Sequence, residues 1–122
     1  MSARVLVVDD SNTVLTYTRE ILKKAGYEVE TSDSIWIASL VQQFKPHLIL
    51  MDLNHGKLQG GNMAITSLKK VPQVGNTRMV LYSSTEPDEL KKICEECGAD
   101  GFIPKTSSSG TLLKEVKKAI KA

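Results

Sequence analysis

The sequence predicts an α/β domain built on a doubly wound parallel sheet. Strand-like apolar runs alternate with helix-like segments along the 122 residues, and five such pairs follow one another through short connections. The runs at residues 4–8 and 48–51 show no polar alternation, which is typical of strands that are covered on both faces. Aspartates follow both runs, at the sheet edge where such folds form their ligand crevice.

In the first half of the chain, strands are expected at residues 4–8, 27–31 and 48–51, and helices at 12–25 and 32–44. A glycine-rich loop at residues 55–61 is expected to lead into a third helix that runs to about residue 70. Ser11 is a good N-cap for the first helix, and Gly26 fits the position after its end. The expected inward face of this helix is Val14, Leu15, Thr18, Ile21, Leu22 and Ala25. The second helix should end before Pro46, because a residue preceding proline disfavours helix.

In the second half, strands are expected at residues 78–82 and 101–103, and helices at 86–97 and 109–121. Pro87 fits the first turn of the earlier helix, and Gly98 fits the position after its end. The expected inward face of the last helix is Leu112, Leu113, Val116, Ala119 and Ile120. No stretch has the composition of an interdomain linker, so we expect one domain over residues 1–122.

Composition argues against several classes of function. The net charge is only +2, and lysine pairs are spread as on solvated helix faces, which gives no reason to expect direct nucleic-acid binding. No apolar stretch is long enough to span a membrane and the start lacks a signal-peptide pattern, so we expect no membrane contact and a cytoplasmic location. Cys94 and Cys97 are expected to be small packed thiols, because a helix end disfavours thiolates and zinc needs more ligands.

Three carboxylates are the main candidates for chemistry. Asp9 and Asp10 follow the first strand, and Asp52 follows the third. One aspartate at such a place is often only a helix cap, but three gathered at one sheet edge repel each other unless a cation offsets their charge. Carboxylate oxygens are ligands that suit Mg²⁺.

A hydroxyl and an ammonium group are expected at the same edge. Ser83 follows the fourth strand, although the stretch Ser83-Ser84-Thr85 also suits a helix N-terminus. Lys105 follows the fifth strand, where an ammonium could bind a carboxylate or phosphoryl oxygen, although most lysines are surface residues. Together with the carboxylates, these groups suit phosphoryl transfer with Asp52 as the nucleophile.

Four motifs resemble the receiver domains of bacterial two-component response regulators. They are Val7-Val8-Asp9-Asp10-Ser11, Leu50-Met51-Asp52-Leu53-Asn54, Ser83, and the stretch 98–105 that ends in Pro104-Lys105. They occur in the family's order and spacing, and the resemblance covers nearly the whole chain. It implies a flavodoxin-like topology with five parallel strands in the order 2-1-3-4-5 and five helices.

The resemblance implies a signalling switch rather than an enzyme. Asp52 would accept a phosphoryl group from a sensor histidine kinase or a histidine phosphotransfer protein. Asp10, Asp52 and the backbone carbonyl of Asn54 would bind Mg²⁺ directly, and Asp9 would act mainly through water. Lys105 would pair with the phosphoryl group.

The resemblance also implies a route for the signal. Ser83 would be the switch hydroxyl, and Phe102 would occupy the switch-aromatic position. Together they would alter the surface formed by the fourth helix, fifth strand and fifth helix, where a downstream protein or effector domain would bind.

The sequence departs from the family pattern in three places. The stretch 55–60 lacks the usual Met-Pro and Asp-Gly, which suggests a changed kinase-docking edge. Thr106 follows Lys105 where the family usually has proline, so the lysine backbone is fixed differently. Phe102 lacks the hydroxyl of the more common tyrosine.

Trp36 is expected within the second helix, at a partly exposed position.

Two other functions remain open. A receiver-fold module that does not take phosphate would keep the fold and bind partners only. A Mg²⁺-dependent phosphohydrolase with an aspartyl-phosphate intermediate is less well supported, because Asn54 stands where the haloacid-dehalogenase group has a second acid. The sequence does not identify the kinase or the output, nor whether the domain stands alone or belongs to a longer chain.

Overall fold

The computed structural model describes residues 2–34, 36–53, 60–72, 74, 77–106 and 108–121. Its strands are β1 (Arg4–Val8), β2 (Glu28–Ser32), β3 (Leu48–Met51), β4 (Arg78–Ser83) and β5 (Gly101–Pro104). Its helices are α1 (Asn12–Lys24), α2 (Ala38–Phe44), α3 (Gly61–Lys69), α4 (Pro87–Cys97) and α5 (Ser109–Lys121). Within these ranges, none of the helices combines the length and apolar character that a membrane crossing requires.

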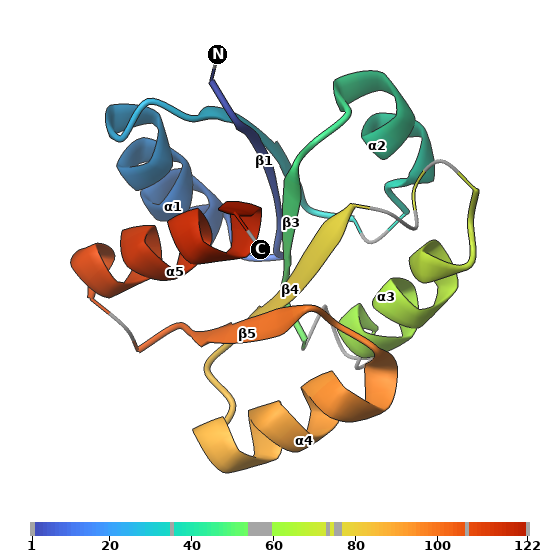
Figure 1. The fold of residues 1–122 in the computed structure, drawn as a ribbon. Helices are drawn as coiled ribbons and strands as arrows, with labels where there is room; N and C mark the ends of the chain where they lie inside the picture. The colour runs from blue at the N-terminus through green and yellow to red at the C-terminus, as the bar shows by residue number, and fades with distance from the viewer. Residues whose placement is uncertain are drawn as a thin grey trace.

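All five strands form one parallel sheet in the order β2-β1-β3-β4-β5, which confirms the predicted fold class and strand order. Helices α1 and α5 cover one face of the sheet, and α2, α3 and α4 cover the other (Figure 1). Val8, the last residue of β1, is paired with Ser32 of β2 and Met51 of β3. The residues that follow these strands therefore meet at one edge of the sheet.

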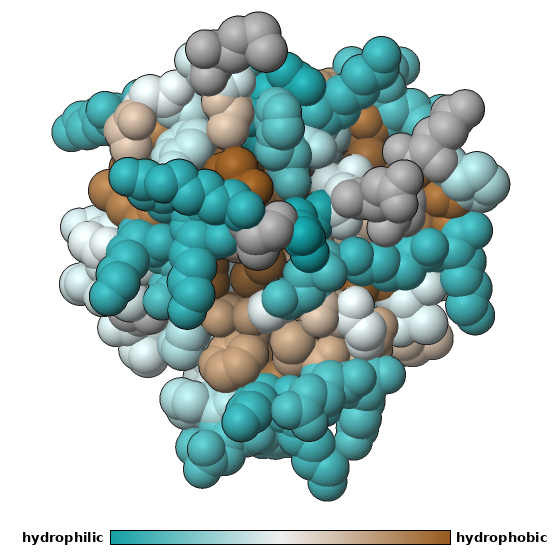
Figure 2. All heavy atoms as spheres, viewed as in Figure 1, coloured by the Kyte–Doolittle hydropathy of each residue, from teal (hydrophilic) through white to brown (hydrophobic). Residues whose placement is uncertain are grey.

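The apolar core is divided between the two faces of the sheet. Successive residues of a strand point to opposite faces, so β1 contributes Leu6 to the cluster under α2, α3 and α4, and Val7 to the cluster under α1 and α5. Every residue of β3 is fully buried, as predicted from its unbroken apolar run. In the view of Figure 2, hydrophilic residues cover the helices and hydrophobic residues show between them.

The prediction for the second helix was wrong at its start. Residues 32–44 were expected to be helical, but α2 begins at Ala38. The Ser32 hydroxyl accepts a hydrogen bond from the Ser34 N–H (3.1 Å) and donates to the Ser34 carbonyl (2.9 Å), and the Ser34 hydroxyl accepts from the Trp36 N–H (3.1 Å). Such side chain–backbone bonds compete with helical ones. Trp36 therefore precedes the helix and is 89% exposed, rather than partly exposed within it.

The other boundaries differ from the predictions by a residue or so. Strand β2 begins and ends one residue later, and β4 and β5 each extend one residue further. Ala25 is exposed rather than inward-facing, because α1 ends at Lys24 and Ala25 is its C-cap. Gly26 and Gly98 adopt the left-handed conformation expected after α1 and α4.

Candidate functional site

The three predicted carboxylates come together at the carboxyl edge of the sheet. The Asp9 N–H donates to the Ser32 carbonyl (3.0 Å) and the Asp52 N–H donates to the Val8 carbonyl (2.9 Å), so both residues continue the pairing of the parallel strands. Oxygens of Asp9, Asp10 and Asp52 all lie within 4.8 Å of one another. Asp9 and Asp52 are only 1% and 4% exposed, whereas Asp10 is exposed.

Helix capping does not account for this cluster. The Ser11 hydroxyl caps α1 by accepting a hydrogen bond from the Val14 N–H (3.3 Å), as predicted from the sequence. Asp9 Oδ1 accepts from the Ser11 N–H (3.0 Å), which fixes the turn between β1 and α1. Asp9 Oδ2 is directed to a different partner, a lysine from the far end of the chain.

Lys105 joins two of the buried carboxylates. Its Nζ lies 2.6 Å from Asp9 Oδ2 and 3.2 Å from Asp52 Oδ1. Its backbone N–H donates to the Ser83 carbonyl (2.8 Å), so the chain after β5 stays paired with β4 and carries the lysine to the cluster. Nζ also lies 5.7 Å from the centre of the Tyr82 ring. The lysine thus reaches the site although Thr106 stands where the family usually has proline.

Opposing effects act on the pKa of Lys105. Burial alone would lower this pKa, but the ion pair with Asp9 and the charge of Asp52 outweigh burial and raise it. The lysine is therefore held in its charged form between the carboxylates. Three carboxylates and one ammonium leave a formal charge of −2 on these four side chains. Hard oxygen ligands with an excess of negative charge fit Mg²⁺.

The two predicted switch residues, Ser83 and Phe102, lie on the adjacent strands β4 and β5. Ser83 ends β4 and is fully buried. Its hydroxyl lies 2.9 Å from the Thr85 hydroxyl and accepts a hydrogen bond from the Thr85 N–H (3.1 Å). Phe102 is half-buried on β5, paired in register with Leu81, and packs against the core under α2, α3 and α4.

Two residues of the site were not predicted from the sequence. Thr85 holds the Ser83 hydroxyl, a role that the Ser-x-Thr spacing could have indicated because such residues form local turns. Gly61 begins α3, and a Cβ added there would lie 2.8 Å from the backbone carbonyl carbon of Asp52. The glycine therefore lets α3 begin directly against Asp52. Asn54 and the stretch 55–59 lie outside the described residues.

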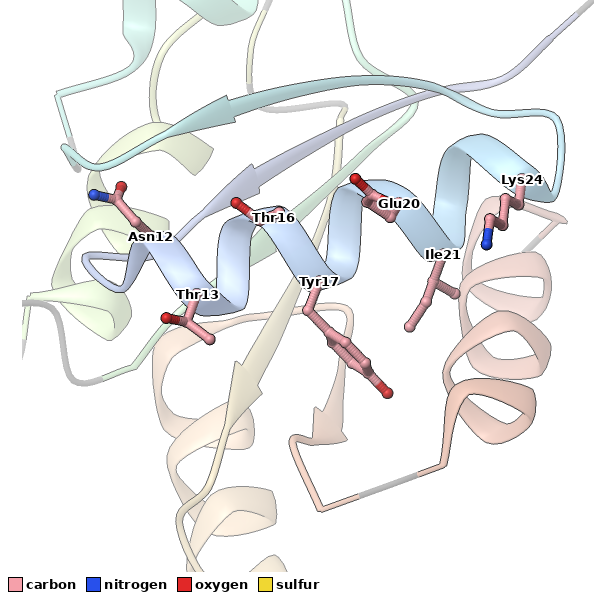
Figure 3. A pocket seen from close by; sticks show the side chains of 7 residues that line it. All are labelled: Asn12, Thr13, Thr16, Tyr17, Glu20, Ile21 and Lys24. Atoms are coloured by element: carbon pink, nitrogen blue, oxygen red, sulfur yellow. The ribbon is translucent and has the colours of Figure 1, made fainter.

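A shallow groove along α1 is a separate feature from the acidic cluster. Its lining is Asn12, Thr13, Thr16, Tyr17, Glu20, Ile21 and Lys24. In Figure 3, Tyr17 and Ile21 project from the side of α1 that is nearer α5, and Asn12 stands at the start of the helix. None of the three clustered carboxylates lines this groove, so the carboxyl edge of the sheet remains the candidate site for chemistry.

Comparisons with known proteins agree with this arrangement. The family model of the response regulator receiver domain matches residues 5–117. The chemotaxis protein CheY of Bacillus subtilis is 26% identical over 98% of this chain and 99% of its own length. The alkaline phosphatase synthesis transcriptional regulatory protein PhoP of the same organism is 31% identical over the whole chain, which spans 48% of PhoP. A solved structure of CheY4 from Vibrio cholerae superposes with a TM-score of 0.87 at 28% identity, covering 98% of this chain and 99% of CheY4.

Proposed function

Because this chain belongs to the response regulator receiver domain family, we propose that it is a phosphorylation-dependent switch in which Asp52 accepts the phosphoryl group. Receiver domains are in general signalling modules of two-component systems rather than enzymes, and the family supports a phosphoacceptor role. The observation that carries the assignment to Asp52 is its nearly buried carboxylate at the sheet edge, in contact with the Lys105 ammonium. The proposed donor is a phosphohistidine on a sensor histidine kinase or a histidine phosphotransfer protein.

The proposed chemistry is a simple displacement. An oxygen of the Asp52 carboxylate attacks phosphorus, the P–N bond of the phosphohistidine breaks, and its electron pair remains on the imidazole. The product is an acyl phosphate on Asp52. Lys105, already 3.2 Å from Asp52 Oδ1, supplies positive charge for the added phosphoryl oxygens.

Mg²⁺ is the proposed cofactor. Asp10, Asp52 and the backbone carbonyl of Asn54 would hold the ion directly, with Asp9 acting mainly through water. When bound, the ion withdraws negative charge from the phosphoryl group. The formal charge of −2 on the four clustered side chains supports this part of the proposal.

The proposed output runs through Ser83. A phosphoryl oxygen on Asp52 competes with Thr85 for the Ser83 hydroxyl, and movement of that hydroxyl opens space for Phe102 to turn inward. The surface of α4, β5 and α5 would then change and bind a downstream protein or effector domain. On this proposal residues 1–122 act as one receiver domain.

Acetyl phosphate with Mg²⁺ tests the assignment of the acceptor. Intact-mass measurement should show one added phosphoryl group that is labile to base and absent when EDTA replaces Mg²⁺. Asp52→Asn should abolish the addition, because an amide is not a competent nucleophile, and Asp33→Asn, a change at an exposed acid after β2, should leave it intact. Addition that survives Asp52→Asn would exclude Asp52. A folded wild type that never gains mass would favour a binding module that is not phosphorylated.

A further inference from the structure

Trp36 is the most exposed of the large apolar side chains in the described parts of the chain. It is 89% exposed, compared with 68% for Met63 and 53% for Tyr17. An indole buries roughly 150–250 Å² when it is covered, so a partner that covers it gains a large apolar contact. Tryptophan is also among the residues that most often dominate the binding energy of protein interfaces.

The backbone that carries Trp36 is held on both sides. On one side, the Trp36 N–H donates to the Ser34 hydroxyl (3.1 Å), and the Ser34 N–H donates to the Ser32 hydroxyl (3.1 Å). On the other side, Ile37 is 1% exposed and packs in the core. The indole is thus presented from a fixed segment, which reduces the entropy lost when a partner binds it.

This segment is connected to the acceptor site. The Ser32 carbonyl accepts a hydrogen bond from the Asp9 N–H (3.0 Å). The hydrogen bonds that link Ser32, Ser34 and Trp36 therefore connect Trp36 to the acidic cluster. Four residues span at most about 14 Å, which limits the separation between Trp36 and Ser32. A standard interface of ~800 Å² per partner has a radius of roughly 16 Å. Because helices cover both faces of the sheet, a protein that delivers a group to Asp52 approaches over this edge. A footprint of this size centred on Asp52 extends across β1 to the end of β2, about 10 Å away, and so reaches the strand end from which the segment carrying Trp36 leaves.

We propose that Trp36 is a docking residue for the protein that donates the phosphoryl group to Asp52. The inference rests on the proposed function and adds a determinant of partner choice to it. Asp10 and Asp33 are exposed at the same edge. The complementary donor surface is an apolar pocket for the indole flanked by basic side chains.

The test measures phosphotransfer from purified catalytic cores of histidine kinases encoded in the same genome, each autophosphorylated with labelled ATP. The initial rate is followed against the concentration of wild type, Trp36→Ser, Trp36→Phe and Met63→Ser. We expect Trp36→Ser to raise the half-saturating concentration by about tenfold or more and to leave the maximal rate unchanged. Trp36→Phe should recover most of the loss, and Met63→Ser, a change at another exposed apolar residue, should match wild type.

Acetyl phosphate separates this inference from the proposed function. If wild type gains no phosphoryl group from acetyl phosphate, the proposed function fails. If all variants react with acetyl phosphate but Trp36→Ser takes phosphate from the kinase as well as wild type does, only the docking role is excluded. If wild type reacts with acetyl phosphate but no kinase core donates to it, a sensor kinase is excluded as the donor together with the docking role, and Asp52 remains the acceptor. An equal loss for Met63→Ser would also exclude it. The chain has a single tryptophan, so emission that changes with the concentration of the protein alone would show a second copy covering Trp36 and overturn the proposal.

Discussion

Lys105 makes it possible to bury two carboxylates side by side in a domain of this size. Asp9 and Asp52 are almost inaccessible to water, and an unpaired charge in such a place would cost several kcal/mol. The lysine side chain is 18% exposed and contacts both. The same contact that stabilises the resting fold keeps a cation beside the proposed phosphoacceptor.

Replacing Lys105 by methionine tests this role. Lys105→Met should lower the free energy of unfolding by about 3 kcal/mol, the low end for a broken buried ion pair, because two buried carboxylates lose their cation and the lysine itself is partly exposed. Millimolar Mg²⁺ should restore much of the loss. Urea unfolding with and without Mg²⁺ measures both effects, and Lys114→Met, at an exposed lysine of α5, is the matched control. Equal stability of Lys105→Met and wild type without Mg²⁺ would contradict this account.

Cys94 gives the fold a pH dependence on the alkaline side. Burial, with smaller effects from Cys97, Glu95 and Asp100, raises the pKa of the Cys94 thiol above its ordinary value of 9.0. The folded state therefore keeps a proton that the unfolded chain releases. This contribution to stability is fully present below about pH 9 and is lost as the pH rises through the raised pKa.

Urea unfolding at a series of pH values from about 8 to 10.5 measures this loss. Cys94→Ala should show a smaller decline per pH unit than wild type, although its stability at neutral pH is also lower because a core side chain is shortened. Burial also raises the pKa of Tyr82 above its ordinary value of 10.0. This adds a second loss of stability at higher pH, which wild type and Cys94→Ala share. Parallel pH profiles for the two proteins would argue against the Cys94 contribution.

At the scale of the elements, strands were predicted better than loops and helix starts. The unbroken apolar runs predicted β1 and β3 because strands covered by helices on both faces bury every residue of such a run. The aspartates that follow these runs predicted the edge of the sheet at which the site lies. The start of α2 was not predictable because Ser32 and Ser34 suit either an N-cap or a turn. The role of Gly61 was not predictable because it depends on a close approach to Asp52, which only the folded chain creates.

The junction of β3 and α3 should be intolerant of a single added methyl group. Gly61→Ala places a Cβ against the backbone of Asp52, and we expect a loss of at least about 2 kcal/mol in the free energy of unfolding. Gly110→Ala is the matched control, because the nearest atom to its added Cβ, the Ser108 hydroxyl oxygen, is 3.9 Å away. It should be neutral or stabilise α5 by up to ~1 kcal/mol. Thermal unfolding of both variants decides the point, and similar stabilities would refute the close approach.

At the scale of the whole molecule, the Ser83–Thr85 contact is the proposed connection between phosphorylation and the surface of α4, β5 and α5. A charge-assisted hydrogen bond contributes about 1.5–3 kcal/mol, which shifts a two-state equilibrium by roughly one to two decades. Ser83→Ala should still take phosphate at Asp52 but respond weakly on this surface. Amide shifts of beryllofluoride-treated proteins measure the response, with Ser84→Ala, at an exposed neighbour, as the control. A full response in Ser83→Ala would show that Ser83 does not connect phosphorylation to the surface of α4, β5 and α5.

Among the residues that the structure describes, the sheet separates the two core clusters. Leu22 of α1 and Leu90 of α4 belong to different clusters. The losses in the free energy of unfolding caused by Leu22→Ala and Leu90→Ala should therefore add in the double variant. Sequence drift on one face therefore leaves the packing of the other unchanged. A lineage can remodel the helices on one side to suit a new partner while the strands, and the acidic edge at their ends, stay as they are.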